Sequence, residues 1–128
     1  MEMMHHAVAW FEVPVVDFDR AKRFYSTIFD YTMPEMTFGT LRMGFFLYER
    51  DKGGIGGAIV HHPEHYRPSA DGVKVYLSGG KDLSTVLDRV EAAGGRVLQA
   101  KKAIGEHMGH MALFKDSEGN VLALHSPE

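Results

Sequence analysis

The sequence contains no cysteine, so the protein has no disulfide, no thiolate nucleophile and no thiolate ligand for a metal ion. It also lacks an excess of positive charge, because its net charge at pH 7 is −3. We therefore expect no nucleic acid and no anionic membrane among its partners. No apolar run approaches membrane-spanning length, and the first residues lack the charged-then-apolar pattern of a signal peptide. These absences predict a cytoplasmic protein.

The composition that remains is that of a globular domain. The chain has 128 residues, of which 45% are hydrophobic and 24% are charged, enough for a single domain with a sizeable core. Histidine and methionine each occur eight times. Because cysteine is absent, histidine, aspartate and glutamate would have to supply the ligands of any metal ion.

The first half of the chain predicts a strand, a helix and three further strands. Residues 7–16 are rich in β-branched and aromatic types, and Pro14 indicates that the far end of this strand is an edge or a bulge. Asp17 is a favourable N-cap for a helix over residues 18–29, whose apolar side chains recur at helical spacing. The remaining strands are predicted at residues 32–38, 41–48 and 55–61.

The second half repeats this order after a polar linker at residues 63–72. A strand at residues 73–77 precedes a helix that Asp82 caps and that stops before Gly94 and Gly95. Three strands follow at residues 96–103, 110–114 and 121–125, and a polar turn over residues 116–120 joins the last two. On the last strand Val121, Ala123 and His125 share one face.

These elements predict an α+β fold of two βαβββ modules, which form a curled mixed sheet around a cleft. Residues 16–25, 82–95 and 114–120 carry a resemblance to the vicinal oxygen chelate superfamily, which includes glyoxalase I, extradiol dioxygenases and bleomycin-resistance proteins. The resemblance covers nearly the whole chain. It implies one domain over residues 1–128, with module one at about 6–62 and module two at about 73–127. It also implies a homodimer, in which the cleft can be shared between chains.

The resemblance places the metal ligands of glyoxalase I on four strands. Three of those positions correspond here to Trp10, to Val73 or Val75, and to Ala123, and the other falls within residues 55–61. Tryptophan, valine and alanine have no side-chain donor for a divalent ion. We therefore predict no metal at the usual site and no other cofactor, which argues against glyoxalase I and extradiol dioxygenase activity.

We predict instead a binding protein for a small apolar or aromatic molecule. The expected cleft walls are Trp10, Phe46, Val75 and Ala123. Glu12 and His125 are the candidate polar or catalytic groups. Glu12 lies among apolar neighbours on the first strand, where a partly desolvated carboxylate could act as a general acid or base, and it could equally pair with Arg42 or His125.

Two alternatives stay open. Glu12, His61 and His125 form a carboxylate-plus-two-histidine set, which could hold a relocated divalent metal for a lyase, isomerase or dioxygenase reaction. Alternatively, the cleft is vestigial and the fold serves as an interaction module.

Overall fold

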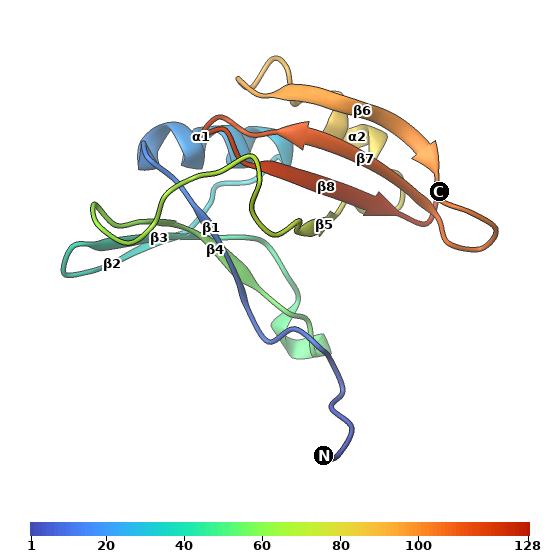
Figure 1. Cartoon of the computed structure of the whole chain (residues 1–128), viewed down its shortest axis with the longest axis horizontal. Helices are drawn as coiled ribbons and strands as arrows, with labels where there is room; N and C mark the ends of the chain where they lie inside the picture. The colour runs from blue at the N-terminus through green and yellow to red at the C-terminus, as the bar shows by residue number, and fades with distance from the viewer.

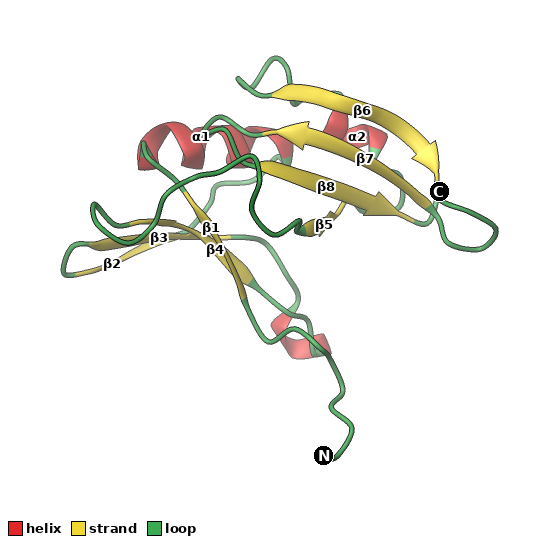
Figure 2. Cartoon of the chain, in the orientation of Figure 1, coloured by secondary structure: helices red, strands yellow, loops and turns green.

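The computed structural model describes all 128 residues of the chain, which form two separate four-stranded sheets and two helices (Figures 1 and 2). The element order repeats the predicted module, with one additional short 3-10 helix. The first module contains β1 (Phe11–Pro14), α1 (Phe18–Ile28), β2 (Glu35–Phe38), β3 (Leu41–Phe45), η1 (Arg50–Lys52) and β4 (Gly57–His61). The second contains β5 (Tyr76–Ser78), α2 (Ser84–Leu87), β6 (Arg96–Ala103), β7 (His110–Lys115) and β8 (Val121–Ser126).

Both sheets have the same topology. The strand orders are β1-β4-β3-β2 and β5-β8-β7-β6. The first strand of each module pairs parallel with the last, and all other pairs are antiparallel. The predicted α+β class and the two βαβββ modules are therefore confirmed. The sheets do not close into one curled sheet, however, and β1 and β5 each remain at the end of their own sheet.

Helix α1 forms where the sequence predicts it. The Asp17 side chain accepts a hydrogen bond from the backbone N–H of Arg20 at 3.1 Å and caps the first turn. The buried stripe of α1 consists of Phe18, Ala21, Phe24, Tyr25 and Ile28. This stripe packs between the modules, because Phe24 lies against Phe114 with ring centroids 6.1 Å apart and Tyr25 lies against Phe46 at 5.0 Å.

The second helix is shorter than predicted. Residues 82–93 were expected to be helical, but α2 covers only four residues and is followed by turns. Hydrogen bonds from Arg89 N–H to the Val86 carbonyl and from Val90 N–H to the Leu87 carbonyl show the tighter three-residue spacing. The apolar stripe is nevertheless buried, with Val90 fully inaccessible. Burial of the predicted apolar face thus keeps this segment packed on the core, although only some of its hydrogen bonds are α-helical.

Strand β5 begins later than predicted. Residues 73–75 precede it with only one ladder contact, from Ala123 N–H to the Val75 carbonyl at 2.9 Å. Val75 is half-buried and packs on the core, whereas Val73 is almost completely exposed. This segment therefore runs along the free end of the second sheet instead of forming a full strand.

One hydrophobic core joins the two modules. It contains 19 buried residues from both helices and both sheets. A second, smaller cluster of Met43, Ala58 and Val60 lies on the other face of the first sheet, where Tyr66 of the linker covers it. Neither helix has the length and the apolar run that a membrane crossing requires.

Candidate functional site

A cavity of about 970 Å³ lies between the two modules, on the side where β1 and β5 end their sheets. Thirteen of its 18 lining residues are hydrophobic. They include residues that flank β1, the chain that follows β3, the segment before β4, and residues 73–80 around β5. Because the sheets do not join, the apolar ends of both remain available to line one space.

Aromatic side chains form much of the cavity wall. Phe11 points to the core side of β1 and packs on Phe46, with ring centroids 5.3 Å apart. Trp10 points to the opposite side, is 40% exposed and lies 6.2 Å from Phe45 between ring centroids. The ring of Tyr48 lies over Gly56, where an added Cβ would come within 2.6 Å of it. The absence of a side chain at Gly56 thus permits this aromatic position in the wall.

Three of the four predicted ligand-binding residues line this cavity, namely Trp10, Phe46 and Val75. Ala123 does not line it. Ala123 is fully buried in β8, opposite Tyr76 of β5 and Leu113 of β7. The neighbouring strands β5 and β7 therefore cover Ala123. The residue pattern of β8 alone does not reveal this packing.

Glu12 lies outside the cavity and has two neutral partners. Its carboxylate accepts a hydrogen bond from the Tyr66 hydroxyl at 2.5 Å and another from Trp10 Nε1 at 3.2 Å. The expected pairing with Arg42 or His125 was wrong, because Arg42 binds Asp19 and Glu35 and stacks over Phe18. Tyr66 comes from the polar linker, where no periodicity in the sequence indicated a role.

His125 lies on the other sheet, away from Glu12. Its Nε2 atom is 2.9 Å from the carbonyl oxygen of Met108. It lines a smaller cavity of about 430 Å³, which shares Tyr76, Leu77, Ser78 and Gly80 with the larger one. The two cavities therefore meet along β5.

Three of the four positions at which the resemblance to glyoxalase I implies metal ligands lack a ligating side chain. The corresponding positions Trp10, Val73, Val75 and Ala123 carry no ligating atom. The alternative set of Glu12, His61 and His125 is not assembled within the chain, since no three histidine, aspartate or glutamate side chains come together in a way that could hold a metal ion.

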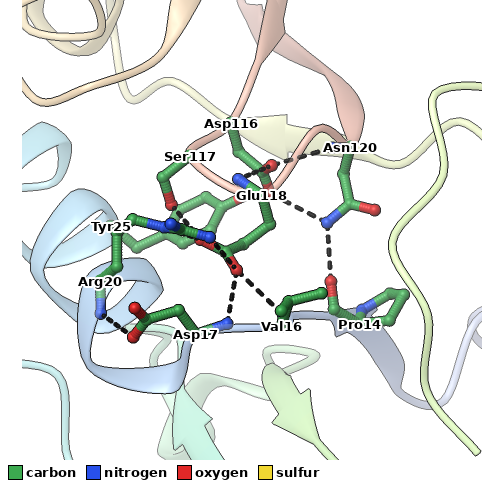
Figure 3. A network of polar contacts seen from close by, with 9 residues as sticks. All are labelled: Pro14, Val16, Asp17, Arg20, Tyr25, Asp116, Ser117, Glu118 and Asn120. Carbon is green, nitrogen blue, oxygen red and sulfur yellow. Dashed lines mark hydrogen bonds and ion pairs between the residues drawn. The ribbon is translucent and has the colours of Figure 1, made fainter.

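A buried polar network fixes the two modules that flank the cavity (Figure 3). The Glu118 side chain is fully buried in the turn between β7 and β8. It accepts hydrogen bonds from the backbone N–H groups of Val16 and Asp17 at 2.9 and 2.7 Å. It also binds the Arg20 guanidinium at 2.7 and 3.1 Å. Glu118 thus anchors the start of α1, although the two lie about a hundred residues apart in the sequence.

The acidic groups of this network respond differently to their surroundings. Burial raises the pKa of Glu118, but the hydrogen bonds from Arg20 and from the backbone outweigh burial, so that the pKa lies below its ordinary value. For Asp116 burial dominates and raises the pKa, although Tyr25 and Asn120 donate to its carboxylate at 2.7 and 3.0 Å. Burial beside Asp116 also raises the pKa of Tyr25 well above its usual range.

Comparison with known proteins places this architecture in a family. A family model described as "Glyoxalase/Bleomycin resistance protein/Dioxygenase superfamily" matches residues 4–124. A glyoxylase-like domain-containing protein from Didymella fabae is 27% identical, over 95% of this chain and 94% of that protein. Such a match over nearly the whole chain agrees with the two-module fold.

Solved structures show the same fold at low identity. The glyoxylase/bleomycin resistance protein/dioxygenase domain from Frankia sp. EAN1pec has a TM-score of 0.71 and 18% identity, with 98% of this chain and 94% of that chain covered. TnmS3, an antibiotic binding protein from Streptomyces sp. CB03234, has a TM-score of 0.67 and 21% identity, with 99% and 100% covered. The chain therefore belongs to the glyoxalase/bleomycin resistance protein/dioxygenase superfamily.

Proposed function

We propose that the protein binds one small apolar or aromatic molecule in the cavity between β1 and β5, and that it does so without a metal ion. The observation that carries this proposal is the combination of an apolar lining with a volume of about 970 Å³, which is typical of small-molecule sites. Phe46 and Tyr48 supply flat surfaces against which an aromatic ring can pack.

A relative with a binding role supports the proposal. TnmS3 is described as an antibiotic binding protein, and it matches this chain over its whole length. Its identity of 21% indicates a common fold, and the ligand of this chain has to be argued from its own cavity. That cavity has no cluster of catalytic acids or bases, because both Glu12 and His125 lie outside it.

We further propose that the protein is a cytoplasmic homodimer. Support for pairing comes from β2, an edge strand of the first sheet, whose large apolar side chains Met36 and Phe38 stay exposed away from the cavity. An unpaired edge strand with apolar side chains can pair with the same strand of a second copy. Sedimentation equilibrium should give twice the chain mass of 14.3 kDa, and a monomer at micromolar concentration would contradict the proposal.

The binding proposal can be tested with N-phenyl-1-naphthylamine, a neutral aromatic probe. Trp10 is the single tryptophan of the chain and lines the cavity, so that its emission reports occupancy directly. We expect saturable quenching of Trp10 in metal-depleted protein. A binding free energy of roughly 0.4 kcal/mol for each non-hydrogen atom of the probe corresponds to a Kd of about 10 µM.

A matched pair of variants separates the cavity from the rest of the surface. Tyr48→Ala removes part of the cavity wall and should weaken probe binding by about fivefold. Leu98→Ala removes a similarly exposed apolar side chain from β6, outside the cavity, and should leave binding within about twofold. Equal effects of both substitutions, or no quenching of Trp10, would overturn the proposed site.

A further inference from the structure

The lining of the cavity has an uneven distribution of charge. Of its 18 residues only Lys74 is charged, and none is acidic. The smaller adjoining cavity adds His125 and Pro127 and again no carboxylate. A cationic molecule would find no counter-charge in either space, whereas an anionic one would meet a single ammonium group.

Lys74 has no partner within the protein. Six other basic side chains form ion pairs with carboxylates: Arg20, Lys22, Arg42, Lys52, Lys81 and Lys101. Lys74 forms no ion pair, and its ammonium donates no hydrogen bond to another residue. Its positive charge is therefore available to a bound molecule, and no internal carboxylate has to be displaced first.

Two neutral donors follow Lys74 along the same face of the chain. Burial alternates through this segment, with Lys74, Tyr76 and Ser78 exposed while Val75 and Leu77 pack on the core. The Ser78 hydroxyl oxygen accepts a hydrogen bond from the Gly80 N–H at 3.3 Å, which leaves the hydroxyl hydrogen free to donate. The Tyr76 hydroxyl has no internal partner. The β5 rim thus presents an ammonium and two hydroxyls beside an apolar space.

We propose that the molecule bound in the cavity carries a single anionic group, such as a carboxylate, which Lys74 holds at the β5 rim while the apolar body lies against Phe46 and Val75. This inference rests on the proposed binding function and narrows its ligand to apolar or aromatic monoacids. The apolar body excludes water from the ion pair, which strengthens an interaction that is weak when fully solvated.

Two probes of the same scaffold test this inference. The neutral N-phenyl-1-naphthylamine and the anionic 8-anilinonaphthalene-1-sulfonate differ by one sulfonate, which stands for the acid group. The wild-type protein should bind the anionic probe about three- to tenfold more tightly, which is the range of a partly desolvated ion pair. Raising the salt concentration should reduce this preference, because mobile ions screen the charge of Lys74.

Three variants assign the preference to one residue. Lys74→Met should reduce the affinity for the anionic probe by about three- to tenfold and leave that for the neutral probe within about twofold. Lys74→Arg should retain the preference. Lys102→Met removes an equally exposed and unpaired lysine from β6, outside both cavities, and should change neither affinity.

The outcomes separate this inference from the binding proposal. Equal affinity of the wild-type protein for both probes overturns the inference and leaves binding of apolar molecules intact. A preference for the anionic probe that persists in Lys74→Met also overturns the inference, because a group other than Lys74 would then bind the sulfonate. Failure of both probes to quench Trp10 refutes the binding proposal and the inference together.

Discussion

Glu118→Gln removes one negative charge from the junction of the two modules while it keeps the shape of the side chain. In the native protein the carboxylate accepts from two backbone N–H groups, from the Ser117 hydroxyl and from two nitrogens of Arg20. A glutamine oxygen can still accept from the backbone, but its NH₂ group cannot accept from Arg20. The substitution therefore cancels a charge-assisted pair between residues 98 positions apart.

The size of the effect follows from the unequal exposure of the partners. Truncating one member of a buried ion pair costs about 3–5 kcal/mol. The Arg20 side chain is 47% exposed and regains water, so that the loss should lie nearer to that of one hydrogen bond to a charged group. We expect the free energy of unfolding to fall by about 2 kcal/mol in Glu118→Gln. Arg20→Met should cost about 1 kcal/mol, since the carboxylate then keeps its backbone donors.

Urea unfolding at pH 7 measures these losses, provided that the slope of the free energy against denaturant stays unchanged. A double-mutant cycle of Glu118→Gln and Arg20→Met should give a coupling of about 1 kcal/mol, because the two side chains share one interaction. Unfolding free energies within about 0.5 kcal/mol of wild type for Glu118→Gln would refute this reasoning.

The pH dependence of the unfolding free energy tests the role of Glu118 independently. The folded pKa of Glu118 lies below its ordinary value of 4.5, so the stabilisation is present above that pH and is lost as the pH falls through the folded pKa. The difference in stability between the wild type and Glu118→Gln should therefore shrink below about pH 4. Asp116, whose pKa is raised, is present in both proteins and cancels from this difference. A difference that stays constant from pH 7 to pH 3 would contradict the assignment.

Three further predictions concern other parts of the molecule. Gly95→Ala should lower the unfolding free energy by about 1–3 kcal/mol in urea titrations, because the new Cβ would lie 2.6 Å from a backbone carbonyl oxygen, while Gly72→Ala, which meets no atom within 4 Å, should be nearly neutral. Lys101 donates to Asp82 and lowers its pKa to about 2, so that NMR titration of Lys101→Met should find this pKa closer to its ordinary value of 3.8. Elemental analysis of untagged protein should find no stoichiometric metal, whereas one metal ion per chain would contradict the proposed metal-free binding.

The sequence predicted the elements best where one local signal decided the structure. Asp17 capped α1 as expected, and β6 has the predicted bounds because a glycine pair precedes it. Pro14 indicated an edge or a bulge in the first strand, and β1 is indeed the edge strand of its sheet. The second helix was overestimated, since its apolar spacing is shared by tighter turns that bury the same face.

The candidate site was less accessible to prediction because it depends on how the modules meet. The sequence predicted Trp10 as a cleft residue but not Phe11, because only the three-dimensional arrangement brings both to one cavity. The turn that contains Glu118 was identified as a marker of the fold, yet nothing in its sequence indicated that this residue binds the start of α1. Contacts over such separations leave no periodic signal in one chain.

A crystal structure of the metal-depleted protein with N-phenyl-1-naphthylamine would test the binding proposal most directly. The proposal predicts electron density for the aromatic rings against Phe46, Tyr48 and Val75, with no metal ion near the probe. Density for the probe on the opposite face of the first sheet, beside Glu12 and Tyr66, or an apolar cavity that stays empty at saturating probe, would contradict it.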